Sequence, residues 1–132
     1  MLVDQLMSPH PLTVGPEATV EQCASLLLSE NVDLLPVVDS QENLIGLVSE
    51  SNLFVALVDQ HRRQDPVSLF MNRQFVAIES TAPLATVVDQ FVLHQVRYLP
   101  VLQNGKLVGV VQRREILKMF DQRSPNRLFS TT

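Results

Sequence analysis

The chain of 132 residues contains a single cysteine, Cys23. An internal disulfide and a metal site built from several cysteines are therefore excluded, and a reducing cytoplasm is the expected location. No apolar run approaches the roughly 18 residues that a membrane-spanning helix needs. The opening Met1–Asp4 is also unlike a signal peptide.

Basic residues are absent from the first half. No lysine or arginine precedes Arg62, whereas nine of the fourteen acidic residues lie at or before Asp59. The formal charge is −9 for residues 1–60 and +5 for residues 61–132. This division argues against a nucleic-acid surface over the whole protein, but it favours a local anion site in the second half.

Catalytic motifs are missing too. The sequence has no Cys-His or Ser-His-Asp arrangement in a supporting context, no His-Glu-x-x-His and no P-loop. Paired carboxylates with acid and base roles are not evident. His10, His61 and His94 lack metal-ligand spacing and are interpreted as surface or structural residues. The sequence predicts a protein that is not an enzyme and has no metal site of its own.

What the chain does contain is an internal repeat. The apolar stretch at residues 34–39 is followed by a polar turn and a glycine-containing stretch at residues 44–52. Nearly the same arrangement recurs at residues 98–102 and 106–115. The offset is 64 residues before the second turn and 63 after it, because that turn is one residue shorter. Each copy predicts two short strands joined by a turn, with a helix directly after the second strand.

A longer helix is predicted before each pair of strands. Thr19 and Gln22 have the spacing of a capping box, and Pro83 stands at or near the first turn of the second helix. Apolar residues share the offsets i, i+3, i+4, i+7 and i+8 in the two helices: Val20, Cys23, Ala24, Leu27 and Leu28, then Leu84, Val87, Val88, Phe91 and Val92. Matching faces indicate duplication. Cys23 lies on such a face and is interpreted as inert core.

The order of extended segment, helix, Leu-Pro-Val strand, turn, glycine-containing strand and helix resembles the CBS domain, named for cystathionine β-synthase. Two in tandem resemble a Bateman module. The resemblance implies an α+β fold of two β-α-β-β-α repeats related by a pseudo-twofold axis. We expect the first CBS repeat at residues 1–60, a linker at 61–66, the second repeat at 67–122 and a flexible tail at 123–132. The chain is interpreted as complete or as a fragment of a larger protein.

The resemblance also implies two clefts between the repeats, where the family commonly binds AMP, ADP, ATP or S-adenosylmethionine. Its nucleotide signature is glycine, two apolar residues, Thr or Ser, any two residues, then Asp. The first copy, Gly46 to Asn52, departs from it only where Asn52 replaces the aspartate. The second copy, Gly109 to Glu115, keeps the glycine and the apolar pair but loses both polar identities. A carboxylate accepts from both ribose hydroxyls, so these departures weaken the expected binding.

Residue by residue, the resemblance implies two nucleotide-binding sites. The better site comprises Ser49, Asn52, Asn72, Ala77, Arg97 and Tyr98. Here Ser49 would bond phosphate or ribose, Asn52 would face the ribose diol, and Arg97 would offer the phosphate a charged donor. The weaker site comprises Ser8, Thr13, Asp33, Leu34, Gln112, Arg113, Arg114 and Glu115. Its Asp33 would repel a phosphate.

Each candidate also has an ordinary structural interpretation. Ser49 can cap its helix, and Asn52 can be a polar residue of the first turn. Arg97 and Tyr98 can be a solvated pair at a strand end, and Arg113 and Arg114 can face an acidic partner.

Two functions therefore remain open. One is a regulatory module that binds an adenine nucleotide, with or without Mg²⁺, and signals to a partner or attached domain. The other is a ligand-free dimerisation or docking module. In either case we expect a homodimer, because isolated CBS pairs commonly associate through their helical faces. The division of charge favours a head-to-tail dimer that brings unlike repeats together.

Overall fold

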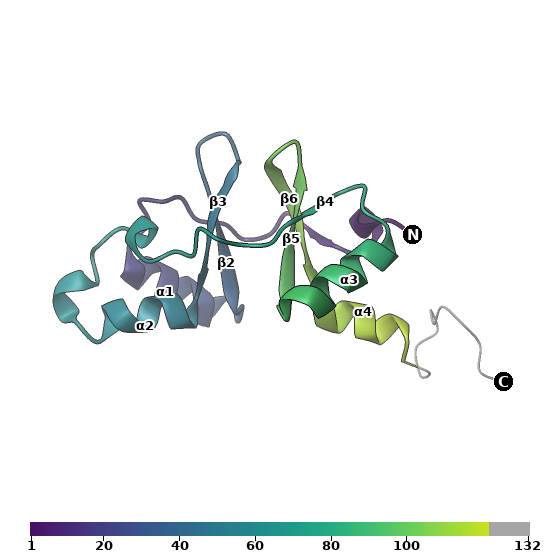
Figure 1. Cartoon of the computed structure of the whole chain (residues 1–132). Helices are drawn as coiled ribbons and strands as arrows, with labels where there is room; N and C mark the ends of the chain where they lie inside the picture. Colours follow the sequence, from purple (N-terminus) through teal and green to yellow (C-terminus); the bar gives the residue numbers. More distant parts are fainter. Residues whose placement is uncertain (122–132) are drawn as a thin grey trace. The chain divides into compact units, whose positions relative to one another are not determined.

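The computed structural model describes residues 1–121, apart from the side chain of Gln60. The flexible tail expected at residues 123–132 lies outside this part. The chain forms two compact units (Figure 1). The N-repeat unit contains residues 11–75 and 104–107, and the C-repeat unit contains, among the described residues, 1–10, 76–103 and 108–121. Each unit therefore includes a segment from the other half of the sequence.

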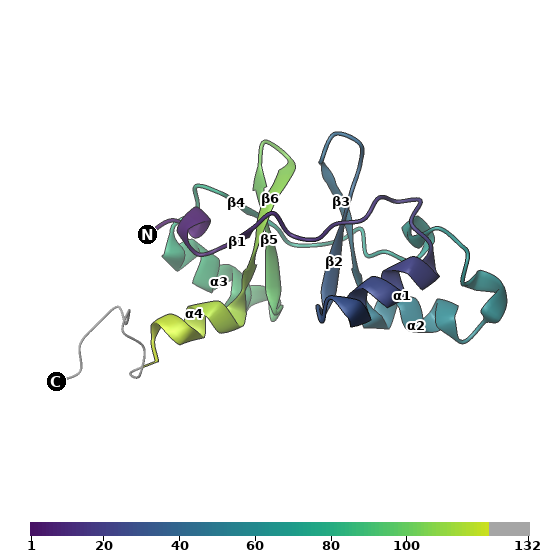
Figure 2. The ribbon, with the colours of Figure 1, turned by 180° about the vertical axis from the view of Figure 1, so that it is seen from behind.

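In the N-repeat unit, helices α1 (Val20–Ser29) and α2 (Glu50–Leu57) pack on the hairpin of β2 (Leu34–Val38) and β3 (Leu44–Ser49) (Figure 2). The two strands are antiparallel, with Leu34 opposite Ser49. Two single-residue bridges extend this sheet on both sides: Val14 pairs with Val37 in parallel, and Asn72 pairs with Leu47 in antiparallel fashion.

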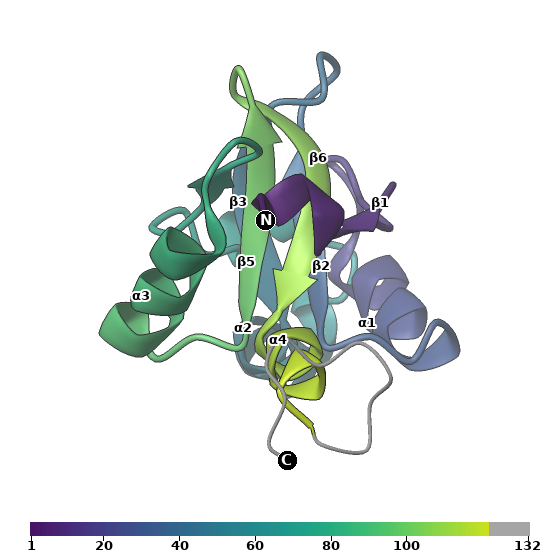
Figure 3. The same cartoon turned by 90° about the vertical axis from the view of Figure 1, so that its right-hand side faces the viewer.

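The C-repeat unit has the same arrangement. Its sheet has the order β1-β6-β5-β4, formed by β1 (Ser8–Pro9), β4 (Ile78–Glu79), β5 (Tyr98–Gln103) and β6 (Lys106–Gln112) (Figure 3). The strand β4 runs parallel to β5, and β1 runs antiparallel to β6. Helices α3 (Leu84–His94) and α4 (Arg113–Met119) complete the unit. The predicted α+β class and the duplication of the unit are confirmed.

Each unit buries its own apolar core. In the N-repeat unit, Cys23, Leu35, Val37, Val48 and Ala56 are fully inaccessible to solvent. Leu99, Val101 and Val111 have the corresponding environment in the C-repeat unit. The predicted helical faces are only partly buried, because the last apolar position of each, Leu28 and Val92, is 81% and 66% exposed.

The start of α1 forms as the sequence predicts. The Gln22 N–H donates to Thr19 Oγ1 at 3.0 Å, and the Thr19 N–H donates to Gln22 Oε1 at 2.9 Å. The segment at residues 61–66 lies along the same helix terminus, where the Val20 N–H donates to Asp65 O and the Glu21 N–H donates to Arg63 O, each at 3.0 Å. The expected linker thus satisfies two N–H groups that the helix leaves open.

The described part of the chain also contains three 3₁₀ turns: η1 (Val3–Gln5), η2 (Gln60–Arg62) and η3 (Val67–Leu69). η1 and η3 occupy equivalent places in the two copies, just before β1 and before the bridge at Asn72. Over residues 1–121, none of the helices has both the length and the apolar character required to cross a bilayer.

The turn between β2 and β3 is organised by the Asp39 carboxylate. Oδ1 accepts the N–H groups of Gln41 at 2.8 Å and Asn43 at 3.0 Å, and Oδ2 accepts Asn43 Nδ2 at 3.1 Å. The tip of the β5–β6 hairpin joins this turn, because Lys106 Nζ donates to Gln41 O at 2.7 Å. The hydrogen bonds from Asn43 and Gln41, and the charge of Lys106, lower the pKa of Asp39 below its ordinary value of 3.8.

We expect this turn to contribute a pH-dependent part of the stability. A carboxylate whose pKa is lowered by folding stabilises the protein fully above its unfolded pKa, and that contribution is lost as the pH falls through the folded pKa. The free energy of unfolding should therefore fall less steeply for Asp39→Asn than for the natural protein between pH 6 and pH 3. Denaturant titrations at several pH values measure this. A difference between the two proteins that stays constant over the range would contradict it.

Candidate functional site

Ser49 and Asn52 form a local pair where β3 passes into α2. Asn52 Oδ1 accepts the backbone N–H of Ser49 at 2.8 Å and the Ser49 hydroxyl at 2.9 Å. Both side chains are half-buried. The amide oxygen of Asn52 thus bonds its own helix terminus, which is the structural role that the sequence left open for both residues.

Asn72 lies beside this pair in the sheet. It exchanges two backbone hydrogen bonds with Leu47, two residues before Ser49, at 2.8 and 2.9 Å. Its side-chain Oδ1 accepts the Gln74 N–H at 3.0 Å, which closes a local turn. Three residues predicted for the better site are therefore gathered at one end of β3, although Asn72 is twenty positions further along the chain.

Three residues predicted for the weaker site, Thr13, Asp33 and Leu34, also belong to the N-repeat unit. Leu34 stands opposite Ser49, so the two expected sites meet in one strand pair. Asp33 directly precedes it and is exposed. Thr13 lies at the other end of the unit, in a hollow with Asp39 and Ser40.

The C-repeat unit brings Arg97 next to Arg113. The Arg113 N–H, at the start of α4, donates to Arg97 O at 2.8 Å. Arg97, Arg113 and Arg114 are all exposed. These three arginines stand at one end of β5 and β6, together with Tyr98 and Gln112, which begin and end those strands. This end of the unit therefore carries three positive charges, which suits an anion.

The remaining C-repeat candidates lie apart from this group or have a local partner. Ala77 directly precedes β4. Ser8, in β1, pairs with Val110 of β6. Glu115 Oε1 forms an ion pair with Lys118 Nζ at 3.1 Å, one turn along α4. The carboxylate that would bond a ribose is thus already paired on its own helix.

Two methionines that were not among the predicted site residues lie against the glycines of the signature. Met71 occupies the space beside Gly46, and Met7 occupies the space beside Gly109. Their 64-residue separation equals the repeat offset. That spacing was the available signal.

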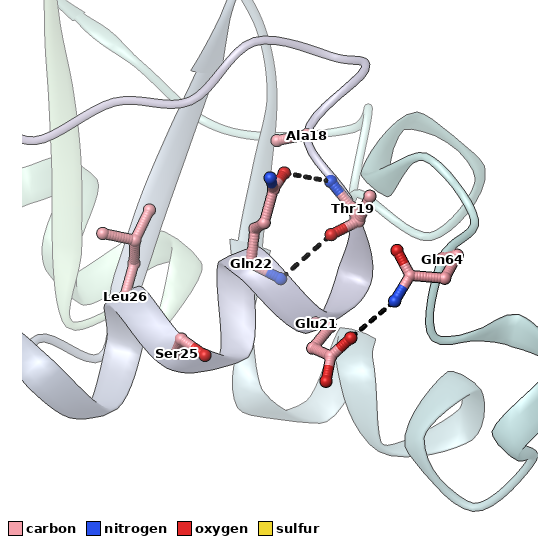
Figure 4. Close-up of a pocket in the computed structure, with 7 residues that line it drawn as sticks. All are labelled: Ala18, Thr19, Glu21, Gln22, Ser25, Leu26 and Gln64. Carbon is pink, nitrogen blue, oxygen red and sulfur yellow. Dashed lines mark hydrogen bonds between the residues drawn. The ribbon is translucent and has the colours of Figure 1, made fainter.

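A hollow beside α1 contains none of the residues predicted for either nucleotide-binding site. It is lined by Thr19, Glu21, Gln22, Ser25 and Gln64, among others, and Gln64 Nε2 donates to the Glu21 carboxylate (Figure 4). The first N–H groups of α1 already have partners, so this helix terminus has no free donor for an anion. We interpret the hollow as a consequence of helix capping.

Cys23 is fully buried, and burial raises the pKa of its thiol to about 11. A thiol with a raised pKa is seldom ionised and therefore a poor nucleophile. The interpretation of Cys23 as inert core agrees with both findings. Among residues 1–121, no three His, Cys, Asp or Glu side chains are grouped as metal ligands.

Comparison with family models and with known proteins points to one family. The family model described as CBS domain matches residues 3–59 and 67–121. The CBS domain-containing protein YhcV of Bacillus subtilis is 32% identical over 110 residues, covering 83% of this chain and 78% of its own. An uncharacterized protein of Methanocaldococcus jannaschii is 25% identical over 117 residues; the match covers 89% of this chain but only 42% of that protein.

Solved structures share the fold. The CBS domain pair of protein MJ0100, in complex with 5′-methylthioadenosine and S-adenosyl-L-methionine, matches with a TM-score of 0.79 and 22% identity over 94% of this chain and 98% of its own. CBSX2 in complex with AMP matches with a TM-score of 0.78 and 24% identity; the match covers 89% of this chain and 93% of that one.

The Ser49–Asn52 pair makes a testable contribution to stability. Asn52→Ala removes the acceptor of the Ser49 N–H, so we expect a loss of about 1 kcal/mol in the free energy of unfolding. Ser51→Ala, on the exposed side of the same turn, is the matched control and should change stability by less than about 0.5 kcal/mol. Urea titrations of the three proteins measure both values. Equal stabilities for the two variants would show that the Asn52 bonds do not hold the helix terminus.

Proposed function

Because this chain belongs to the CBS-domain family and carries two of its repeats in tandem, we propose that it is a regulatory module, not an enzyme, that binds an adenosine-containing ligand of the AMP, ADP or ATP type. The ligand would shift the packing of the module and so signal to a partner or attached domain. We place this activity in the cytoplasm.

The observation that carries the proposal is the grouping of Ser49, Asn52 and Asn72 at one end of β3. They come from the signature of one repeat and the opening segment of the other. In addition, two structures with the same fold contain AMP or S-adenosyl-L-methionine. We propose that the three residues form one half of a ligand site and that the ribose is bonded from α2.

Ala77, Arg97 and Tyr98 would supply the other half. Arg97 uses its carbonyl for Arg113 but has an exposed side chain, so its guanidinium is available for a phosphate. Charge-assisted hydrogen bonds to phosphate are roughly twice as strong as neutral ones. We assign Arg97 the phosphate and the neighbourhood of Ala77 the adenine.

The second site would be weaker for reasons visible in the described residues. Glu115 is paired with Lys118, and the Asp33 carboxylate repels phosphate. Arg113 and Arg114 are the favourable members of that set. We therefore propose one principal ligand per chain.

The ligand-free docking module is the second candidate, and one observation favours it. Asn52 Oδ1 already accepts two hydrogen bonds from Ser49, so a ribose hydroxyl must share or replace them. Only the Asn52 amide N–H₂ is then a ready donor to the ligand.

A thermal melt distinguishes the two functions. AMP, ADP, ATP and S-adenosylmethionine should each be tested with and without Mg²⁺. A ligand at 100 times its dissociation constant should stabilise the fold by about 2.7 kcal/mol, a rise of several degrees in Tm. The rise should disappear in Ser49→Ala or Arg97→Ala. It should grow in Asn52→Asp, because a carboxylate accepts from both ribose hydroxyls.

Ser25→Ala serves as the control, since this serine is exposed on α1 and should leave the shift unchanged. A 2′-deoxy form of the active nucleotide should lose the gain in Asn52→Asp. No shift with any of these compounds would reject the regulatory proposal and leave the docking module.

We further propose a homodimer formed through the helices. In the N-repeat unit, Leu28, Phe54 and Val58 at α1 and α2 are 81%, 59% and 86% exposed. Leu28 and Phe54 line a largely apolar groove together with Ala24, Leu27, Leu53, Leu57 and the acidic Glu50, whereas Val58 directly follows α2 and is not part of the lining. In the C-repeat unit, Val92, Leu93 and Leu117 are exposed on α3 and α4. Such helical faces are costly to leave in water, and a second copy would cover them.

Charge supports a head-to-tail arrangement less strongly in the folded units than in the sequence halves. Arg62, Arg63, Arg73 and Lys106 belong to the N-repeat unit. That unit therefore has nine acidic and four basic residues, whereas the described C-repeat residues include five and four. The head-to-tail arrangement stays a proposal, in which the exposed arginines of α4 face the acidic unit of the second copy.

The dimer proposal predicts that Phe54→Glu raises the dimer dissociation constant at least tenfold, because it places a charge in the apolar groove. Leu69→Glu is the matched control: Leu69 is 62% exposed in the same unit but lies on η3, away from the groove. Sedimentation at several concentrations measures both. A head-to-tail dimer should also weaken at high salt. A monomeric natural protein at all concentrations would reject the proposal.

A further inference from the structure

The glycine of the first signature copy lies directly against a methionine side chain. A Cβ added to Gly46 would stand 2.5 Å from Met71 Sδ and 2.8 Å from Met71 Cγ, closer than real contacts allow. Gly46 is buried, on the same side of β3 as Leu44 and Val48. Protein atoms therefore fill the place from which a ligand would approach this face of the glycine.

The second copy repeats the contact. A Cβ on Gly109 would stand 2.8 Å from Met7 Cγ, with the Met7 sulfur nearer still and Ser8 O at 3.0 Å. The three nearest atoms to a Cβ on Gly46 all belong to the Met71 side chain, whereas those at Gly109 include the backbone oxygen of Ser8. Gly109 should consequently tolerate a Cβ less well than Gly46.

Each methionine lies in a segment that is also held to the glycine-containing strand by backbone hydrogen bonds. Met71 is 8% exposed and ends the turn that begins at Val67, with its N–H donating to Val67 O at 2.9 Å. The next residue, Asn72, pairs with Leu47. In the other unit, the Met7 N–H donates to Val3 O at 3.0 Å, and the next residue, Ser8, pairs with Val110.

We infer that each methionine sets the requirement for glycine in the signature and positions the residue that follows it, Asn72 or Ser8, beside the glycine-containing strand. The glycines then serve the docking of a segment from the opposite repeat and make no ligand contact of their own. The assignment of Asn72 and Ser8 as ligand residues rests on the proposed function. The contacts between each methionine and its glycine do not depend on the proposed function.

A double-mutant cycle tests these contacts. Gly46→Ala should lower the Tm by several degrees in the natural background, because overpacking a filled core strains it. In a Met71→Ala background the same change should cost about nothing, since the clashing atoms are gone. Gly109→Ala should cost more than Gly46→Ala, and Met7→Ala should rescue it only in part because Ser8 O remains. An equal cost of Gly46→Ala in both backgrounds, or no cost in either, would overturn the inference.

Hydrogen exchange tests the positioning role separately from stability. Met71→Ala should lower protection of the Leu47 and Asn72 amides at least tenfold more than that of the Val48 amide, while a merely structural loss would lower all three alike. If Met71→Ala does not fold, Met7→Ala with the amide of Val110 provides the same measurement in the other unit.

Ligand affinity tests whether Gly46 contacts the ligand. The probe is AMP, or whichever compound shifts the Tm. Gly46→Ala/Met71→Ala should bind it more weakly than the natural protein, and by the same factor as Met71→Ala alone. A further loss caused by the glycine substitution would overturn the claim that Gly46 makes no ligand contact. Failure of every compound to bind would reject the proposed function but leave the outcome of the cycle valid.

Discussion

The docking of a segment from each repeat onto the hairpin of the other is the constraint on which this structure depends. Residues 1–10 belong to the unit of the second hairpin, and residues 66–75 belong to the unit of the first. Without those segments, Leu47 and Val110 would lack their backbone partners on the outer side of the sheet. Unpaired strand edges are costly and prone to association. A repeat cut at its sequence boundary would keep its own hairpin but lose the outer segment that the other repeat adds to its sheet.

This exchange also explains how the candidate residues are gathered. Ser49 and Asn52 belong to the first repeat, where β3 passes into α2, and the Leu47–Asn72 bridge brings Asn72 of the second repeat to the same end of β3. An insertion or deletion between residues 58 and 66 would therefore act on the candidate site as well as on the connection. The same stretch satisfies the first N–H groups of α1 through Arg63 and Asp65, so it has a structural role beyond length.

The polar side chains of the signature are used for local hydrogen bonds and ion pairs, and these compete with contact to a ligand. Asn52 uses its oxygen to hold the start of α2, while an aspartate there could bond Ser49 and a ribose with different oxygens. Glu115 is paired along its own helix. These local bonds form without a ligand, so a ligand must compete with them. A weaker ligand response than that of a full signature follows naturally from this arrangement.

The sequence by itself determined the duplication, the strand–turn–strand segments, the helical faces and the capping of α1 at Thr19. These features are encoded within a few residues of one another, in periodicity, turn residues and cap spacing. It also pointed to Ser49 and Asn52, but it left their role open because one hydroxyl or amide can serve a helix or a ligand. The structure shows that they bond each other across the first turn of α2.

Contacts between residues far apart in the chain were beyond the sequence. It did not reveal that Met71 fills the space beside Gly46, because a methionine in an apolar position reads the same whether it faces a leucine or a glycine. Nor did it show that Leu28 and Val92 end exposed, since periodicity defines a helical face but not how far neighbouring elements cover it. Tertiary packing alone decided which apolar atoms were buried and which four basic side chains joined the acidic unit.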